Sequence, residues 1–175
     1  GLNTNLQNDK GDTIFHNNEY IPLLPLAIDN GFDITIKNNN GDTVLHHASI
    51  YCDALLKKAI ENGFNIHTRN NDGRTILHKK HFWYLTEAMN YGFNINSLDN
   101  CGNTIFHYNY ENDLLAFAIQ SGFNVNLQNQ NGHTIFHVGY KNQIDLAIEY
   151  GLNTRLKSKY GATILLEKTD YSFIN

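Results

Sequence analysis

The sequence predicts an all-α fold, a solenoid of stacked helix-turn-helix units joined by extended, β-hairpin-like loops. Three observations predict it. A first phrase begins at residues 11, 41, 73, 102, 132 and 161 and reads GDTIFH, GDTVLH, GRTILH, GNTIFH, GHTIFH and GATILL. A second phrase, such as GFNIN at residue 92, begins 10 residues before each of these. An apolar pattern of helical spacing separates the two phrases in every complete unit. The first phrases start 29 to 32 residues apart, and a recurrence at this spacing is typical of repeat proteins.

The first phrase predicts the start of a helix. A threonine stands two residues after the glycine, and a histidine follows three residues later in five units. Threonine at the N-cap with a polar side chain at the third helical position forms a capping box, so the imidazole is expected to hydrogen-bond back to the preceding turn. Protonating these imidazoles should therefore lower stability as pH falls through about 6.5. The predicted pairs are Thr13 and His16, Thr43 and His46, Thr75 and His78, Thr104 and His107, and Thr134 and His137.

The segment after the histidine predicts a second helix. Counting back from the glycine of the second phrase, position 4 is alanine in all five units, position 3 is Ile or Met, and position 7 is Leu or Ile. This spacing gives one apolar helical stripe, and the glycine can take the left-handed conformation that ends a helix. The ten-residue connection from the second phrase's glycine to the next first phrase is rich in Asn, Asp and Gly, so it predicts an extended loop with a tight turn.

These phrases resemble the ankyrin repeat, which carries Gly-x-Thr-Pro-Leu-His and then Gly-Ala-Asp-Val-Asn on a period of about 33 residues. The resemblance covers nearly the whole chain and recurs in register. It identifies the chain as a divergent ankyrin array within a single domain, 1–175. The expected repeats are 11–40, 41–72, 73–101, 102–131 and 132–160, with a partial, loop-only repeat at 1–10 and a partial or capping repeat at 161–175.

Three departures from the family pattern stand out. The proline after the threonine is Ile or Val, the alanine after the second glycine is Leu or Phe, and every unit is shorter than about 33 residues. Because the loop length is fixed, the shortening must fall in the first helix or the turn after it. We expect the enlarged Phe side chains to fill the space that a short first helix leaves.

The resemblance implies a non-catalytic protein-protein interaction module. Ankyrin domains bind folded proteins or extended peptides, here through loop tips and the concave face of the first helices. Frequent Asn, Ile, Lys and Tyr suit an A/T-rich genome and favour the targeting arm of a larger host-directed effector. The alternative is a structural array packed against a catalytic domain elsewhere in the full-length chain, which predicts an apolar patch near Gly1 or Asn175.

The predicted partner-binding residues are those whose identity varies from one repeat to the next. Loop tips and the aromatic region after the histidine supply them, since Tyr and Trp are enriched among interface hot spots. For the aromatic residues, an anchoring role and a core role both remain open. The set is Asp9, Lys10, Asp12, Tyr20, Asn40, Asp42, Tyr51, Asp72, Arg74, His81, Asn103, Tyr110, His133 and Tyr140.

Other functional classes find little support in the sequence. There is no nucleophile elbow, phosphate-binding glycine loop or His-Glu-x-x-His motif, so no catalytic residue and no cofactor are expected. Equivalent histidines on adjacent units stand a helix spacing of about 8 to 10 Å apart, too far to share a zinc ion, so no metal is expected. A net charge of -4 argues against nucleic acid.

The chain is expected to be a monomer as an isolated domain. No apolar run approaches the roughly 20 residues of a membrane span, and the first ten residues lack the features of a signal peptide. Cys52 and Cys101 are expected to be reduced thiols. These features predict a cytoplasmic or intracellular location, with delivery into a host cell left open.

Overall fold

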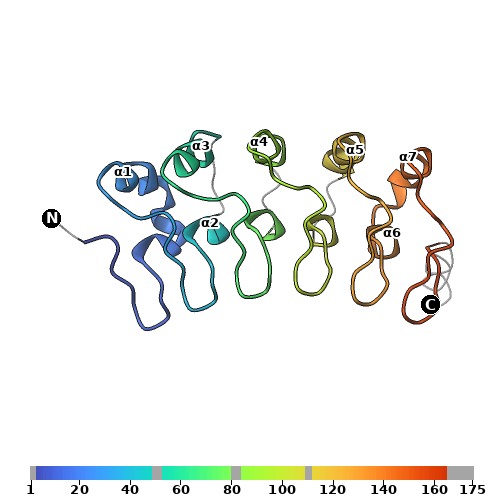
Figure 1. Cartoon of the computed structure of the whole chain (residues 1–175), viewed down its shortest axis with the longest axis horizontal. Coiled ribbons are helices and arrows are strands. Elements are labelled where there is room, and N and C mark those ends of the chain that lie inside the picture. Colours follow the sequence, from blue (N-terminus) through green and yellow to red (C-terminus); the bar gives the residue numbers. More distant parts are fainter. Residues whose placement is uncertain (1–2, 49–52, 80–83, 109–111, 165–175) are drawn as a thin grey trace. The chain divides into compact units, whose positions relative to one another are not determined.

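The chain folds into two compact units, Gly1–Asn94 and Ile95–Asn175, in a computed structural model that describes residues 3–48, 53–79, 84–108 and 112–164. Each repeat within a unit has a one-turn first helix, a second helix and a hairpin loop (Figure 1). The all-α prediction is confirmed. The single domain over 1–175 stays a prediction.

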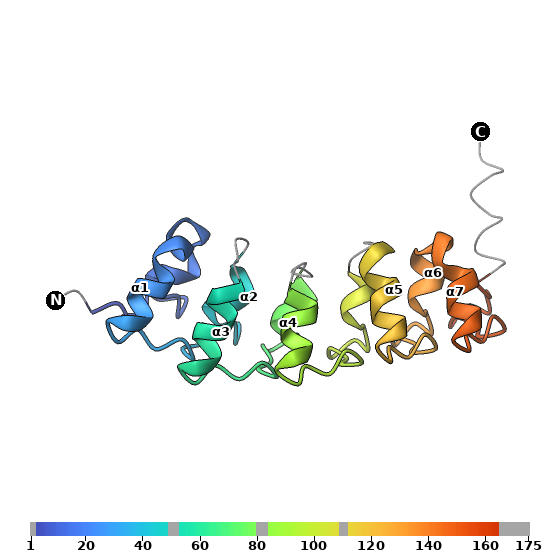
Figure 2. The same ribbon diagram turned by 90° about the horizontal axis from the view of Figure 1, so that it is seen from above.

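In the first unit, the second helices lie side by side, and the hairpins extend from the opposite side of the first helices (Figures 1 and 2). The first helices are η1 (Ile14–His16), α2 (Val44–His47) and η3 (Ile76–Lys79). The second helices are η2 (Asn18–Leu23) running into α1 (Leu24–Asp29), then α3 (Asp53–Glu61) and α4 (Leu85–Asn90).

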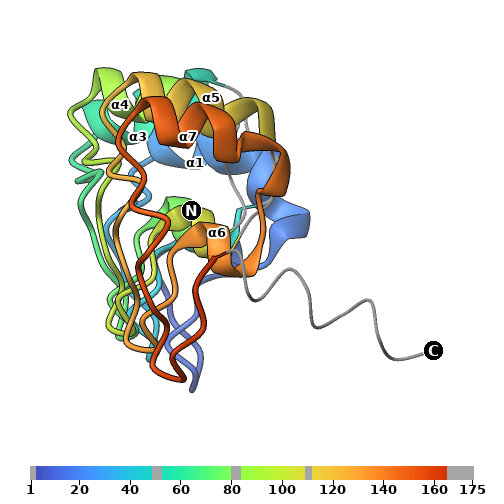
Figure 3. The ribbon, with the colours of Figure 1, turned by 90° about the vertical axis from the view of Figure 1, so that its right-hand side faces the viewer.

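The second unit repeats this arrangement. Figure 3 shows α7 above α6, with the loops extending away below them. Its first helices are η5 (Ile105–His107) and α6 (Ile135–Val138). Its second helices are α5 (Asn112–Gln120), and η6 (Lys141–Gln143) followed by α7 (Ile144–Glu149).

The second helices end in the same way in every repeat. In α3, the Gly63 N–H donates to the Ile60 carbonyl at 3.1 Å and the Phe64 N–H donates to the Ala59 carbonyl at 2.9 Å. This pair of bonds is the Schellman motif, and Gly63 has a φ of 95°, as the motif requires. The predicted alanine stripe is buried, as are Phe32, Phe64, Phe93 and Phe123 after the glycines.

The enlarged Phe residues pack beneath the short first helices. The ring of Phe32 lies 4.8 Å from that of Phe15 on η1, edge to face, and Phe123 lies 4.9 Å from Phe106 on η5. Since each first helix is a single turn, an alanine in place of Phe32 or Phe123 would leave this volume empty. The contacts agree with the space-filling role expected of these residues.

The loops are hairpins with little regular pairing. Isolated antiparallel bridges join Lys37 to Thr43 and Lys157 to Thr163. The glycine of the first phrase has a positive φ at each hairpin tip; for Gly41 it is 74°. These features match the predicted β-hairpin-like loops with tight turns.

Candidate functional site

The hairpins are held by a side chain that the sequence argument did not single out. It stands three residues before the glycine of the first phrase. In the second hairpin, the Asn38 Oδ1 accepts hydrogen bonds from the N–H groups of Asn40 and Asp42, both at 3.0 Å. The other residues at this position are Asn8, Asn70, Asp99, Asn129 and Ser158, and all but Ser158 accept the same two bonds.

Neighbouring hairpins of the first unit are bonded to each other. The Asn39 N–H donates to the Lys10 carbonyl at 3.0 Å, and the Asn71 N–H donates to the Asn40 carbonyl at 2.9 Å. Side chains add a parallel connection, because the Asn38 Nδ2 donates to the Asp12 carboxylate at 2.8 Å. The hairpins therefore form a fixed row, and their tip residues keep a defined spacing.

The histidines of the first phrase connect each repeat to the next. The Thr43 N–H donates to His46 Nδ1 at 3.1 Å, so this nitrogen carries no proton, and Nε2–H donates to the Arg74 carbonyl at 3.2 Å. His16 makes the equivalent bond to the Asp42 carbonyl, and His107 to the His133 carbonyl. His78 and His137 accept the same bonds from their threonines. All five predicted caps are present.

Burial shapes the acid-base behaviour of these caps. It lowers the pKa of His46 to about 4, against the opposing influence of Asp42 and of the hydrogen bond to the Arg74 carbonyl. Burial likewise lowers the pKa of His16 and of His107. A neutral imidazole with both nitrogens engaged is poorly placed to act as a general base, so these histidines are structural.

Two cavities lined by polar and charged residues lie between the hairpins of the first unit. One, of about 240 Å³, is lined by Asp9, Lys10, Asp12, Asn38, Asn39 and Asn40. The next, of about 290 Å³, is lined by Asn40, Asp42, Asn70, Asn71, Asp72, Arg74 and Lys79. Both include Asn40, so they are adjacent; we call them together the hairpin groove.

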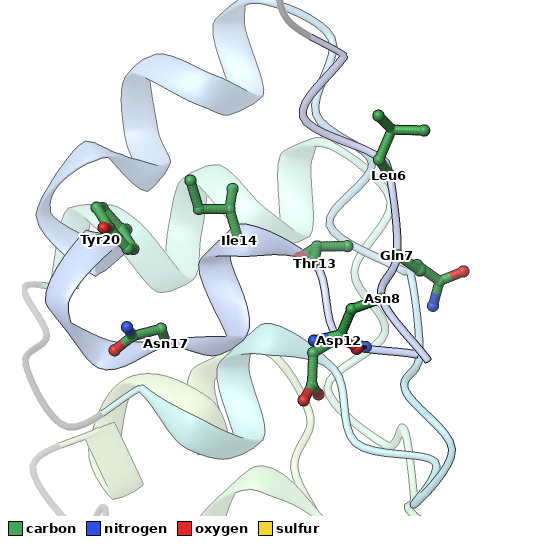
Figure 4. Close-up of a pocket in the computed structure, with 8 residues that line it drawn as sticks. All are labelled: Leu6, Gln7, Asn8, Asp12, Thr13, Ile14, Asn17 and Tyr20. Atoms are coloured by element: carbon green, nitrogen blue, oxygen red, sulfur yellow. Dashed lines mark hydrogen bonds between the residues drawn. The ribbon is translucent and has the colours of Figure 1, made fainter. Parts of the chain in front are cut away.

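A third cavity, of about 460 Å³, opens at the first repeat (Figure 4). Leu6 on the loop faces Ile14 and Tyr20 on the helical part, and Asp12 lies at its polar edge. Its lining is mainly apolar. Gln7, Asn8, Thr13 and Asn17 complete it.

Comparison with solved structures identifies the architecture. The crystal structure of the ankyrin repeat domain of Bcl-3, a unique member of the IkappaB protein family, superposes with a TM-score of 0.67. The match covers 94% of this chain and 81% of that one, at 21% sequence identity. The chain has the ankyrin-repeat fold. No family model and no curated protein matches the sequence.

The ankyrin fold brings several predicted partner-binding residues together. Asp9, Lys10, Asp12 and Asn40 line the first cavity of the hairpin groove, and Asp72 and Arg74 line the second. Asn103 and His133 occupy the corresponding loop position in the second unit, where both are half-buried. Tyr51, His81 and Tyr110 lie outside the described residues.

Asp42 is a correction to the predicted partner-binding set, because its side chain is buried. It accepts hydrogen bonds from Lys79 Nζ at 2.7 Å and Asn70 Nδ2 at 2.8 Å, and His47 Nε2 lies 3.2 Å from it. Burial alone would raise the pKa of Asp42, but these three groups outweigh it and hold that pKa below its usual range. Its carboxylate is saturated from within the chain and is not available to a partner.

Tyr140 is a second correction. Its side chain is buried, and its ring lies edge-on to that of Phe106 at 6.3 Å. It has a φ of 59°, a left-handed conformation that reverses the chain between α6 and η6. Of the two roles left open for this residue, the core role is the one observed. Tyr20, by contrast, is half-buried and lines the apolar cavity.

Within residues 3–48, 53–79, 84–108 and 112–164, no group of three His, Cys, Asp or Glu side chains is placed to hold a metal ion. In the same ranges no helix is long and apolar enough to cross a membrane. Cys101 is an exposed free cysteine, while Cys52 lies outside the described part of the chain.

Proposed function

We propose that this chain is a non-catalytic protein-binding module that holds a protein or extended peptide segment in the hairpin groove. Folds of stacked repeats generally use such extended surfaces for protein-protein interaction. The observation that carries the proposal is that two adjacent cavities, both lined by polar and charged residues, share Asn40. Seven of the predicted partner-binding residues line them, on a backbone fixed by inter-hairpin hydrogen bonds. Of these seven, Asp42 has its carboxylate engaged within the chain.

The two cavities of the hairpin groove differ in charge, which would orient a bound segment. The first holds the carboxylates of Asp9 and Asp12 beside Lys10. In the second, Asp42 is neutralised by Lys79, and Arg74 lies 3.5 Å from Asp72. The Asp72 and Arg74 pair is partly exposed and therefore contributes little to stability, so a partner can compete for either side chain.

Site-specific photo-cross-linking tests this proposal. A photo-reactive amino acid placed at Asn40 or at Asp72, both exposed in the hairpin groove, should yield covalent adducts with one protein from the native host, identified by mass spectrometry. The matched control is Glu61, an equally accessible side chain on α3, away from the hairpins. We expect no adduct from this position.

A double variant that removes two charges from the hairpin groove provides a second test of the proposal. Asp72→Ala with Arg74→Ala removes an exposed pair and should leave the melting temperature within a few degrees, since such a pair is worth about 1 kcal/mol or less. It should reduce adduct formation from Asn40. Equal adduct yields from Glu61 and Asp72, or no change in the double variant, would place the binding surface elsewhere.

The setting we propose for this module is the targeting arm of a larger, host-directed protein. Its support is compositional, from the abundance of Asn, Ile, Lys and Tyr. The alternative function, an array packed against another part of a longer chain, has one observation in its favour. Four large apolar side chains are exposed together on the first repeat.

A further inference from the structure

Large apolar side chains are exposed on the side of the first repeat against which a preceding repeat would stack. Leu6 on the loop, Ile14 on η1, Leu23 on η2 and Leu26 on α1 are 67%, 44%, 56% and 63% exposed. Leu6 and Ile14, together with the half-buried Tyr20, line the mainly apolar cavity of about 460 Å³ (Figure 4). We call these five residues the N-terminal face. Exposed apolar groups gathered in this way mark an interaction site more often than singly scattered ones do.

Two of these repeat positions are buried in the later repeats of the first unit, where a preceding repeat is present. Ile14 corresponds to Val44 and Ile76, which are 0% and 3% exposed. Leu23 corresponds to Leu55 and Tyr84, which are 3% and 2% exposed. These residues are all large and apolar, so the difference lies in the neighbour and not in the chemistry of the position.

Polar contacts show which side of each repeat faces the preceding repeat. Lys58 on α3 occupies the repeat position of Leu26, and its Nζ pairs with Asp29 on the preceding α1. In the hairpins, Asn39 and Asn71 each donate a backbone N–H to the preceding hairpin. The equivalent donor in the first repeat is the Asp9 N–H, which has no preceding hairpin beside it among the described residues.

We propose that the N-terminal face binds one further ankyrin-type repeat, joined to Gly1 and packed in the same direction as the repeats at 11–40 and 41–72. The face continues an interface already formed twice within the first unit. Because Leu26 replaces the lysine found at Lys58, the incoming second helix needs an uncharged residue where α1 has Asp29. Its hairpin supplies a carbonyl for the Asp9 N–H, as Lys10 does for Asn39.

Thiol labelling of the whole chain tests this proposal. Ile14→Cys is made in a Cys52→Ser, Cys101→Ser background, with and without a copy of residues 93–121 fused ahead of Gly1. That copy ends after α5 and carries Gln120, not an acid, at the position of Asp29. We expect the Ile14→Cys thiol to react with a soluble maleimide at least about tenfold more slowly in the fusion, because the docked repeat covers it.

Val138→Cys is the matched control, since Val138 on α6 is 41% exposed and lies in the other unit. Its labelling rate should be the same with and without the fusion. Leu23→Asp in the fusion should restore rapid labelling of the Ile14→Cys thiol, since a buried unpaired carboxylate opposes docking.

Two outcomes would overturn the proposal. Equal Ile14→Cys rates in the fused and unfused chains would show that a repeat does not cover the N-terminal face. A rate that falls in the unfused chain as protein concentration rises about a hundredfold would assign the face to a second copy instead. The result is independent of the hairpin groove, because neither the fusion nor these variants change the exposed side chains tested there.

Discussion

The imidazole of His46 caps its own helix, bonds to the next repeat and is buried. Its Nδ1 accepts from the N–H of its own N-cap, Thr43, its Nε2–H donates to the Arg74 carbonyl of the next repeat, and its ring is buried between them. A second proton on the ring would have to sit on Nδ1, facing the Thr43 N–H. Charge on this residue therefore opposes both the cap and the burial of the ring.

Lowering the pH should destabilise the fold through these histidines. The pKa of His46 is about 4 in the folded chain, below its ordinary value of about 6.5, so the unfolded chain binds more protons between these two values. Stability is thus complete above about pH 6.5 and is lost as pH falls towards 4; at about pH 5.5 His46 alone accounts for about 1 kcal/mol. His16 and His107 act in the same direction.

Melting temperatures measured at about pH 7.5 and pH 5.5 check this expectation. His46→Gln is the control, because glutamine can accept and donate hydrogen bonds but does not titrate in this range. It should lower stability at both pH values and make the difference between them smaller. Identical melting temperatures of the parent chain at the two pH values would contradict the prediction.

Asp42 and Asp12 occupy the same repeat position but should differ in their effect on stability. Asp42→Ala leaves the buried Asn70 amide and the Lys79 ammonium without their acceptor, which should cost about 2 to 3 kcal/mol. Asp12 is half-buried and accepts one side-chain bond, from Asn38, so Asp12→Ala should cost about 1 kcal/mol. Urea unfolding compares the two, and equal losses would refute a distinct structural role for Asp42.

At the scale of the element, each repeat contains two glycines with positive φ that are needed for different reasons. Gly63 ends α3, and a Cβ built on it meets nothing within 4 Å. Gly41 turns a hairpin tip, and a Cβ there would lie 2.8 Å from the backbone nitrogen of Asn71 in the next hairpin. The helix end requires only the backbone conformation, whereas the hairpin also requires close approach.

Alanine substitution should separate these two requirements. Gly63→Ala carries only the conformational penalty of a left-handed residue, about 1 to 2 kcal/mol. Gly41→Ala adds a steric conflict with the adjacent hairpin and should cost more, at least about 3 kcal/mol in total. Chemical denaturation of both variants measures the difference, and a Gly41→Ala variant no less stable than Gly63→Ala would contradict the close approach.

At the scale of the whole molecule, stability should vary along the chain, because each repeat gains most of its burial from its neighbours. α3 packs its Leu55 side chain beneath the preceding repeat, while Leu23 at the corresponding position before α1 is exposed. Native-state hydrogen exchange should therefore find faster exchange in α1 than in α3. Equal protection of the two helices would show that the N-terminal face does not weaken the first repeat.

How much was predictable depends on the range of the interactions involved. The repeat register, the five caps and the helix-ending glycines were predicted, since they rest on contacts between residues three to five apart, such as Thr43 with His46. Asn38 was overlooked as the hairpin residue. Its signal was present in the sequence, because Asn or Asp stands three residues before the glycine in five of the six first phrases.

The sequence by itself determined the ankyrin-repeat architecture of this chain, because capping, helix ends and turn glycines are local requirements that recur in every repeat. Only the tertiary structure decided which of the variable residues remain available to a partner. Asp42 and Asp12 have the same local sequence position, yet one is enclosed by Lys79, Asn70 and His47 and the other lines an open cavity. The burial of each side chain depends on contacts with residues of neighbouring repeats, 26 to 37 positions away in the sequence. The sequence pattern within one repeat does not specify those contacts.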